Sequence, residues 1–335
     1  RADLILLNTC CVRETAEDKV YGKIGEIKHI KRMNPALIFG ITGCMAQKEG
    51  EALIRRAPHI DFVLGTNKVH ELKATVRRLE SARRGPVVDV LLGDAPLPEN
   101  VPIERTGRLS AWVPIMYGCN NFCTYCIVPY TRGHERSREV ESILREIDHM
   151  VELGYREVTL LGQNVNSYGL DREELRFPEL LRRVSEIPGL RRIRFMTPNP
   201  KDFSEELIDL IGERENICRH IHLPLQSGST EVLRRMNRHY TKESYLALVR
   251  RIREKLPDVS LTTDIIVGFP GESERDFQDT MDVVRRVGFD SAFTFVYSKR
   301  SGTPAAKWEG VSEELVKDRF HRLLDAVRES SSENE

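Results

Sequence analysis

Three cysteines stand close together before the middle of the chain, and they limit its chemistry more than any other feature. Cys119, Cys123 and Cys126 have the spacing C-x3-C-x2-C and follow an apolar, strand-like run at residues 111–117. Three thiolates on one loop can hold three irons of a cubane cluster and leave the fourth iron open to a substrate. A structural zinc site needs four closed ligands, and no fourth cysteine lies nearby in the sequence. The spacing therefore predicts a 4Fe–4S cluster with one open iron; the alternative is three buried thiols that cluster by accident.

Composition excludes several classes of protein. An odd total of 7 cysteines in 335 residues argues against a disulfide scaffold and suits metal ligation in a reducing compartment, so we expect a cytoplasmic location. The sequence contains no run of 18 or more apolar residues, so no membrane span is expected. The formal net charge is zero, and nucleic-acid binding would have to rest on local basic patches.

The order of strand-like and helix-like runs predicts an α/β protein with an N-terminal parallel α/β sandwich domain and a partial (β/α)6 barrel. Residues 1–82 carry short apolar strands at 3–7, 36–41 and 61–64, with helices at 14–31, 47–56 and 68–79. Residues 83–109 are rich in Pro and Gly and are interpreted as a linker. Residues 110–335 contain six further βα units. Their strands are expected at 111–117, 157–161, 192–196, 220–225, 260–268 and 291–297, and their helices at 138–153, 178–187, 205–211, 242–255, 274–287 and 313–329. Barrel active sites lie at the carboxyl ends of the strands, where the cysteine loop falls.

A second pair of cysteines ends two strands of the first domain. Cys10 follows the first strand and Cys44 follows the second, so a parallel sheet would bring both to one edge, where they could ligate a cluster. Small buried cysteines are also common at strand ends, which leaves a structural role open. Cys11 comes directly after Cys10, and alternation along a strand points its side chain to the other face, which favours a structural role.

Polar and glycine residues close several barrel strands. Gln163 follows the second strand, Gln226 and Ser227 follow the fourth, and Gly268 and Gly271 follow the fifth. Glycine allows close approach of a ligand to the backbone, and Gln or Ser offers hydrogen bonds to it. Ordinary βα turns favour the same residues, so spacing alone leaves both interpretations open.

The cysteine motif, with Tyr125 before its last cysteine, resembles that of the radical S-adenosylmethionine (SAM) enzymes. The resemblance implies that the open iron binds SAM, and that one electron from the cluster cleaves SAM to a 5′-deoxyadenosyl radical. It also implies that Tyr125, Gln163, Gln226, Ser227, Gly268 and Gly271 contact this cofactor.

Within those enzymes the chain is similar to the MiaB-like tRNA methylthiotransferases over nearly its whole length. The resemblance is carried by Asn8-Thr9-Cys10 with Val12-Arg13-Glu14, by Gly43-Cys44-Met45 and by Tyr117 to Tyr130. It implies that Cys10, Cys44 and an upstream cysteine hold an auxiliary 4Fe–4S cluster. It implies that a methylthio group is added at C2 of N6-isopentenyladenosine next to the anticodon in tRNA, with one SAM supplying the methyl group and another the radical.

The same resemblance predicts three partners: tRNA, a flavodoxin-type electron donor or reductase, and a sulfur donor. It predicts a monomer that does not associate with a membrane. Basic residues near the strand ends, among them Arg132, Arg138, Arg234, Arg235 and Arg238, could meet phosphates or form a solvated rim. The chain is expected to be a fragment that lacks the family's N-terminal start and its C-terminal TRAM domain. Two other functions remain open: methylthiation of an aspartate in a ribosomal protein, and a non-catalytic iron–sulfur electron carrier.

Overall fold

The computed structural model describes residues 2–11, 14–81, 85–91, 105, 107, 109–172 and 175–333. The chain divides into two compact units. The first comprises Arg1–Val101, Cys126–His134 and Ser298–Thr303, and the second comprises Pro102–Tyr125, Glu135–Tyr297 and Pro304–Glu335. Cys119 and Cys123 therefore belong to the second unit, whereas Cys126 opens a segment of the first.

The first unit is built around a four-stranded parallel sheet in the order β1-β2-β3-β4. The strands are β1 (Leu4–Thr9), β2 (Ile38–Gly43), β3 (Phe62–Leu64) and β4 (Val87–Asp89). All six residues of β2 are buried, as expected for a strand covered on both faces. Alternate side chains divide between the faces: Phe39 and Ile41 join one apolar cluster, and Ile38 joins another with Leu79.

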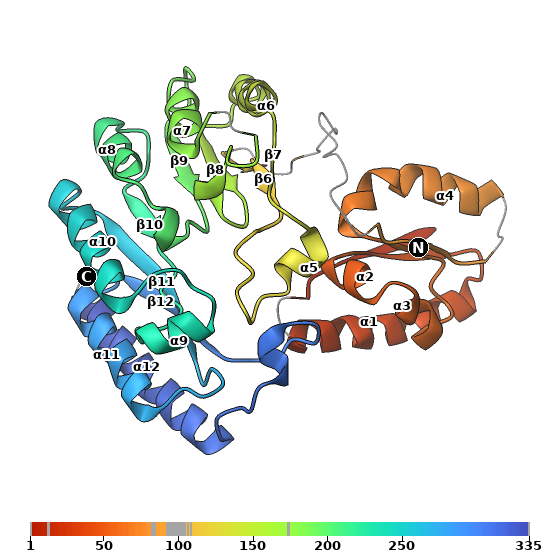
Figure 1. Ribbon diagram of the computed structural model, residues 1–335. Coiled ribbons are helices and arrows are strands. Elements are labelled where there is room, and N and C mark those ends of the chain that lie inside the picture. Colours follow the sequence, from red (N-terminus) through yellow and green to blue (C-terminus); the bar gives the residue numbers. More distant parts are fainter. Residues whose placement is uncertain are drawn as a thin grey trace. The chain divides into compact units, whose positions relative to one another are not determined.

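Helices cover both faces of this sheet (Figure 1). The helices α1 (Glu14–Met33), α2 (Cys44–Glu49) and α3 (Glu51–Arg56) lie on one face, and α4 (Leu72–Ser81) lies on the other. The short helix α5 (Val128–Arg132) packs against α2 and against the 3-10 turn η1 (Thr66–Glu71). This arrangement is the α/β sandwich that the alternating pattern predicts.

Two details of the first unit differ from the sequence-based expectation. The helix expected at residues 47–56 is divided by Gly50, whose φ of +50° takes the backbone out of the helical region between α2 and α3. Strand β4 lies inside the expected linker at 83–109 and pairs with β3 through Val63↔Val88. Most other linker residues, namely 83–84, 92–104, 106 and 108, lie outside the described part of the chain.

The second unit contains six parallel strands with helices on their outer side, which is the predicted partial barrel (Figure 1). The order β5-β8-β9 forms one sheet and β10-β11-β12 the other. The strands are β5 (Ser110–Pro114), β8 (Glu157–Leu161), β9 (Arg192–Phe195), β10 (His220–His222), β11 (Ser260–Val267) and β12 (Ser291–Val296). The surrounding helices are α6 (Val140–Glu152), α7 (Phe177–Ser185), α8 (Glu205–Glu213), α10 (Lys242–Lys255), α11 (Glu274–Val287) and α12 (Glu313–Glu333).

Local sequence signals explain where several of these elements begin and end. Helices α10 and α11 start with capping boxes, in which Thr241 and Ser273 each accept a hydrogen bond from the backbone three residues on. Gly288 ends α11 in the left-handed conformation. The remaining short elements are β6 (Met116–Tyr117), β7 (Arg136–Ser137), η2 (Val165–Ser167), η3 (Pro200–Asp202), α9 (Thr230–Arg235) and η4 (Pro304–Lys307). Among the helices described, none has both the length and the hydropathy needed to cross a membrane.

Candidate functional site

The cysteine loop starts from a small antiparallel ladder in the second unit. Strand β6 leads into the loop and β7 follows it, with Met116 paired to Ser137 and Tyr117 to Arg136. Between Cys119 and Cys123, Phe122 has a φ of +45°, an uncommon conformation for a bulky side chain. The ladder and this sharp turn shape the first part of the loop.

The segment that joins α9 to α10 holds the cysteine loop from the other side. Asn237 Nδ2 donates to the carbonyl oxygens of Asn121 at 3.0 Å and of Phe122 at 3.1 Å. The backbone N–H of Thr124 donates to Met236 O at 3.1 Å, and its hydroxyl donates to Arg235 O at 2.9 Å. Because three of these bonds involve backbone groups of the loop, they help to fix its path.

Each of the two loop cysteines in this unit, Cys119 and Cys123, receives a hydrogen bond at its sulfur. Cys119 is 9% exposed and Cys123 is 7% exposed. Asn121 Nδ2 donates to Cys119 Sγ at 3.3 Å, and Arg238 Nη1 donates to Cys123 Sγ at 3.5 Å. Burial raises the pKa of Cys119, and hydrogen bonds from Asn121 oppose that rise. Buried thiols supplied with N–H donors suit iron–sulfur ligation, because a ligating sulfur is a thiolate that accepts such bonds.

The predicted ligands are not gathered into one ready-made cluster. Within the described residues, no group of three or more His, Cys, Asp or Glu side chains is placed to hold a metal ion. Cys119 and Cys123 lie in the second unit, and Cys126, which is partly exposed, lies in the first. The three-cysteine set therefore remains a prediction from the spacing.

The first unit places Cys10, Cys11 and Cys44 directly after the ends of two paired strands. The ends of β1 and β2 are neighbours, with Thr9 paired to Gly43, so Cys10 and Cys44 do follow adjacent strand ends. However, Cys10 is exposed, and the thiol that hydrogen-bonds with Cys44 is that of Cys11. Cys11 is buried whereas Cys10 is exposed, in line with the expectation that the two side chains point to opposite sides. The structural role of Cys11 stays a prediction.

The electrostatic setting of Cys44 favours a thiolate. The hydrogen bond from Cys11 lowers the pKa of Cys44, although burial opposes this effect and Arg132 contributes to it. Arg132 lies on α5, which packs against α2 within the same unit. Arg132, which could meet phosphates according to the sequence, is therefore also a cation near Cys44, a candidate cluster ligand.

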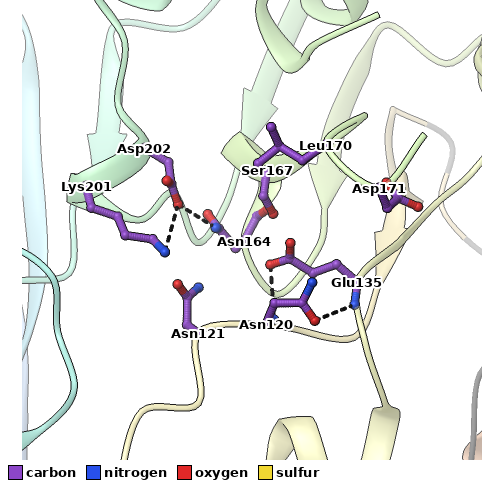
Figure 2. Close-up of a pocket in the computed structure, with 9 residues that line it drawn as sticks. All are labelled: Asn120, Asn121, Glu135, Asn164, Ser167, Leu170, Asp171, Lys201 and Asp202. Atoms are coloured by element: carbon purple, nitrogen blue, oxygen red, sulfur yellow. Dashed lines mark hydrogen bonds and ion pairs between the residues drawn. The ribbon is translucent and has the colours of Figure 1, made fainter. Parts of the chain in front are cut away.

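A polar pocket of about 260 Å³ lies beside the cysteine loop at the carboxyl ends of β8 and β9 (Figure 2). Figure 2 shows Asn120 and Glu135 joined in a reciprocal pair. The backbone N–H of Asn120 donates to Glu135 Oε1 at 3.3 Å, and the backbone N–H of Glu135 donates to Asn120 Oδ1 at 3.2 Å. Burial raises the pKa of Glu135, and the hydrogen bond from Asn120 opposes the rise.

The opposite side of the pocket carries a second carboxylate and a cation. Asn164 Nδ2 donates to Asp202 Oδ2 at 2.8 Å, and Lys201 Nζ lies 4.0 Å from the same oxygen. The other lining residues are Asn121, Ser167, Leu170 and Asp171. A pocket with both acidic and basic groups is complementary to a small polar ligand that carries both charges.

Gln163, a predicted SAM contact, has an unsatisfied polar atom. Its Oε1 is buried, and within the described part of the chain it has no hydrogen-bond partner. A buried acceptor without a partner costs roughly 1–3 kcal/mol, so it suggests a missing ligand.

Gln226 and Ser227, two predicted SAM contacts that follow β10, have contacts within the protein. Gln226 has a φ of +64° and pairs through its backbone with β11, and the Ser227 hydroxyl lies 3.4 Å from that of Thr280.

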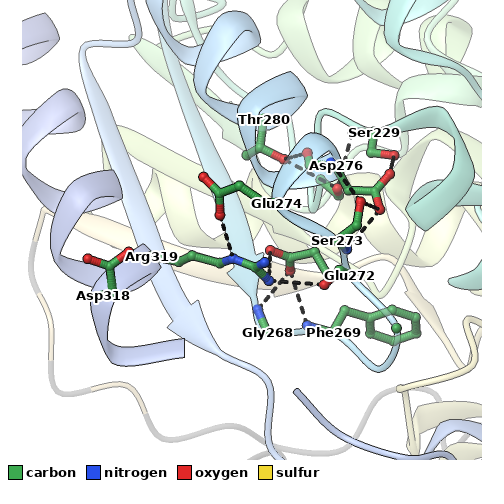
Figure 3. Close-up of polar contacts among 12 residues, drawn as sticks. Ser229, Gly268, Phe269, Glu272, Ser273, Glu274, Asp276, Thr280, Asp318 and Arg319 are labelled. Carbon is green, nitrogen blue, oxygen red and sulfur yellow. Dashed lines mark hydrogen bonds and ion pairs between the residues drawn. The ribbon is translucent and has the colours of Figure 1, made fainter. Parts of the chain in front are cut away.

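The loop after β11 is held in place by hydrogen bonds to a buried carboxylate (Figure 3). Glu272 Oε2 accepts hydrogen bonds from the backbone N–H groups of Gly268 at 2.8 Å and Phe269 at 3.2 Å. Arg319 from α12 donates to Glu272 Oε1 at 3.3 Å. Burial raises the pKa of Glu272 to about 7, even though Arg319 and the two N–H donors favour its charged form.

Both glycines of this loop have structural reasons for their identity. Gly268 has a φ of +73°, and a Cβ there would lie 2.6 Å from the side chain of Val316. Gly271 has a φ of +76°, and a Cβ there would meet the Arg235 guanidinium at 2.0 Å. Their predicted role in ligand approach therefore coexists with a backbone requirement, since both adopt a positive φ.

Tyr125 packs into an aromatic group around Phe269. The ring centroids of Tyr125, Tyr297 and Trp308 lie 6.4, 5.4 and 5.9 Å from that of Phe269, each edge to face. Sequence reasoning missed Glu135, Asp202 and Asn237, and it left Arg238 open between a phosphate contact and a solvated rim. The sequence signal for these residues was weak. Each follows a predicted strand or motif, but residues that it contacts lie far away in the sequence.

Comparison with known families gives two matches within the chain. Residues 113–284 match the model described as the Radical SAM superfamily, and residues 1–65 match the model described as Uncharacterized protein family UPF0004. The first match contains the cysteine loop, the polar pocket and the loop after β11, and the second contains Cys10 and Cys44.

Two curated relatives carry the same functional name. The protein from Desulforamulus reducens is 52% identical over 336 residues, covering 99% of this chain and 74% of the relative. The protein from Carboxydothermus hydrogenoformans is 54% identical over 329 residues, covering 97% of this chain and 74% of the relative. Both are named tRNA-2-methylthio-N(6)-dimethylallyladenosine synthase.

Solved structures share the fold at low sequence identity. The radical SAM methyltransferase TsrM from Kitasatospora setae has a TM-score of 0.64 at 17% identity, covering 91% of this chain and 65% of TsrM. The cobalamin-dependent radical SAM enzyme OxsB has a TM-score of 0.61 at 14% identity, covering 98% of this chain and 48% of OxsB. At these identities the likeness concerns the fold alone.

Proposed function

The chain belongs to the family of tRNA-2-methylthio-N6-dimethylallyladenosine synthases, which are radical SAM methylthiotransferases, and we infer its activity from that membership. It adds a methylthio group to C2 of N6-isopentenyladenosine next to the anticodon in tRNA. The observation that carries this conclusion is the 52% identity that extends over 99% of the chain, through both the cysteine loop and the first domain. An isolated electron carrier would not require this whole assembly.

The cofactors are SAM and two 4Fe–4S clusters, and the residues present fit them. When bound, the clusters and SAM supply reductive cleavage of SAM, a methyl group and a site for the sulfur that is inserted. We assign Cys119, Cys123 and Cys126 to the SAM-binding cluster, and Cys10 and Cys44 to the auxiliary one. Two observations support the fit: the N–H donors at the sulfurs of Cys119 and Cys123, and the Cys44 setting that favours a thiolate.

The SAM contacts are proposed from the same loops. Gln163 is the strongest candidate, because its buried Oε1 has no partner in the described part of the chain. The pocket beside the cysteine loop has carboxylates and a lysine that complement the ammonium and carboxylate groups of an amino acid. Tyr125, Gln226, Gly268 and Gly271 remain candidates, and Ser227 is a weaker one since its hydroxyl lies close to Thr280 within the protein.

The partners and the domain division complete the proposal. The substrate is tRNA, and the reaction needs an electron donor of the flavodoxin or reductase type and a source of sulfur. We propose a monomer in the cytoplasm, where tRNA and reduced thiols are available. We propose an N-terminal domain at 1–82, a linker at 83–109 and a barrel domain at 110–335. The family matches at 1–65 and 113–284 support two separate domains, while β4 joins part of the proposed linker to the first sheet.

The test starts from protein reconstituted with iron and sulfide in the absence of oxygen. With dithionite, SAM and tRNA that carries isopentenyladenosine, 5′-deoxyadenosine should form, and mass spectrometry of digested tRNA should show the methylthio nucleoside. Replacing Cys123 with Ala should abolish 5′-deoxyadenosine formation. Cys218→Ala is the matched control, because Cys218 lies outside both predicted ligand sets.

The outcomes separate the competing functions. Reduction of a bound cluster without any 5′-deoxyadenosine would favour an electron carrier and contradict the proposal. Product on a ribosomal-protein peptide but not on tRNA would assign the chain to the other methylthiotransferase branch.

A further inference from the structure

Arg238 lies where a charged side chain can act on a predicted cluster ligand. Its Nη1 donates to Cys123 Sγ at 3.5 Å, although 115 residues separate the two in the sequence. It belongs to the same segment whose Asn237 and Met236 hold the backbone of the cysteine loop. The position of the guanidinium relative to Cys123 is therefore set by several bonds between the two segments.

Tyr240 holds the guanidinium in place. Arg238 Nε donates to Tyr240 Oη at 3.1 Å, and the guanidinium carbon lies 5.1 Å from the centre of the tyrosine ring. The Tyr240 hydroxyl in turn donates to the carbonyl oxygen of Leu225 at 2.9 Å, and the side chain is 9% exposed. The backbone N–H of Arg238 also donates to Leu233 O at 2.8 Å. Since both its backbone and its side chain are anchored, Arg238 presents a fixed donor to the sulfur.

The charge of Arg238 is not neutralised by a neighbouring carboxylate. Within the described residues, its side chain bonds with Tyr240 and Cys123 and forms no ion pair with Asp or Glu. Arginine stays protonated at any pH a protein survives, so the positive charge is permanent. The other buried ligand differs, because Cys119 receives its hydrogen bond from the neutral amide of Asn121.

We propose that Arg238 is a positioning residue that raises the reduction potential of the cluster held by Cys123. The inference rests on the proposed function. The cluster takes up one electron from a low-potential one-electron donor; no bond at Cys123 forms or breaks, and no proton moves because the guanidinium is already protonated. A fixed positive charge and an N–H bond to a ligating sulfur both stabilise the state with the additional negative charge. Arg238 thus makes the cluster easier to reduce by its electron donor.

The test measures the midpoint potential of the cluster directly, apart from turnover. The wild type, Arg238→Lys, Arg238→Met and Tyr240→Phe are reconstituted without oxygen, and iron per chain and circular dichroism are recorded for each. Redox titration followed by EPR then gives the potential. The Met variant should have the lowest potential, since it lacks both the charge and the donor. The Lys variant should be intermediate, because it keeps the charge without the planar fork. Tyr240→Phe should also lower the potential.

Arg234→Met is the matched control. Arg234 is exposed on α9, and its guanidinium pairs with Glu231 at 2.6 Å instead of contacting the cysteine loop. Its replacement should leave the potential and the iron content unchanged. This control separates the contact with Cys123 from a general effect of removing a positive charge from this region.

The outcomes distinguish this inference from the proposed function. An Arg238→Met protein with full iron and an unchanged potential would overturn the inference and leave the function intact. If the Met variant loses iron, the Lys variant decides: a lowered potential supports the inference, and an unchanged one overturns it. A wild type whose reduced cluster gives the same EPR spectrum with and without SAM would overturn the proposed function, and the inference with it.

Discussion

Arg319 on α12 donates through Nη1 to Glu272 Oε1 at 3.3 Å, and the two side chains are 3% and 5% exposed. The same guanidinium donates to the backbone carbonyl of Glu272 at 3.0 Å. Because Glu272 also binds the backbone of Gly268 and Phe269, this pair connects the last helix of the barrel to the loop that follows β11. The loop that follows β11 is a predicted SAM contact. Its shape depends on Arg319, which lies far from that loop in the sequence.

Replacing Arg319 with Met should destabilise the second unit by about 1–3 kcal/mol, because the buried oxygens of Glu272 lose a hydrogen-bond donor. Urea unfolding followed by the fluorescence of Trp308, whose ring packs against Phe269, measures the loss. Arg328→Met is the control, because Arg328 is exposed on the same helix, and exposed substitutions usually change stability by less than about 0.5 kcal/mol. Similar losses in both variants would show that the buried pair has no special role.

Stability should depend on pH through Glu272. Burial raises its pKa to about 7 from an ordinary value of 4.5, so between these values the folded state holds a proton that the unfolded state has released. Stability from this group is therefore complete below about pH 4.5, decreases as pH rises to about 7, and is constant above that value. Glu272→Gln cannot titrate, so the wild-type stability minus that of the variant should fall between pH 5 and 7. A difference that is flat or rises over this range would contradict the assignment.

Gly268→Ala should destabilise the loop after β11. A residue with a side chain at a φ of +73° costs about 1–2 kcal/mol, and the new methyl group would also press on Val316. Thermal unfolding should show a lower midpoint, and SAM should bind more weakly to the reconstituted protein. Gly310→Ala is the control, since a Cβ at Gly310 meets no atom within 4 Å. Equal midpoints for the two variants would contradict the strain argument.

Glu135→Ala should weaken SAM use without removing iron. The backbone N–H of Asn120 would lose its acceptor, which costs roughly 1–3 kcal/mol when the donor stays buried. The apparent KM for SAM in 5′-deoxyadenosine formation should rise several-fold, whereas Glu135→Gln should keep a near-normal value because its amide oxygen can still accept. Glu139→Ala, a change at an exposed residue paired with Arg172, is the control. If Glu135→Gln is as impaired as Glu135→Ala, the charge and not the hydrogen bond is what matters.

The auxiliary cluster should depend on Cys10 and Cys44 but not on Cys11. In a protein whose three barrel cysteines are replaced by Ala, the remaining iron reports this cluster alone. Adding Cys10→Ser or Cys44→Ser should remove most of that iron, because each takes away a ligand. Adding Cys11→Ser should leave it largely bound, since Cys11 lies outside the predicted ligand set. If Cys11→Ser removes as much iron as Cys10→Ser does, Cys11 is itself a cluster ligand and this prediction is wrong.

The sequence alone determined the order of the elements and the chemistry of the cysteine loop. Strand β8 and the helices α10 and α11 begin and end at the predicted residues, because their apolar periodicity and capping residues are local signals. The C-x3-C-x2-C spacing predicts iron–sulfur chemistry for a similar reason: three thiols within eight residues can reach one cluster in many backbone conformations. Sequence failed locally at Gly50, where one positive φ divides the expected helix.

Tertiary structure decided which side chains meet around that loop. Arg238 contacts Cys123 across 115 residues, Asn237 binds the backbone of Asn121 across 116, and Arg319 meets Glu272 across 47. No local pattern encodes such pairs, because they depend on how the βα units pack and on which direction each loop leaves its strand. In the sequence Arg238 is one arginine among several near a strand end. Only the folded barrel separates it from Arg234, four residues earlier, by turning one side chain to the sulfur of Cys123 and the other to Glu231 at the surface.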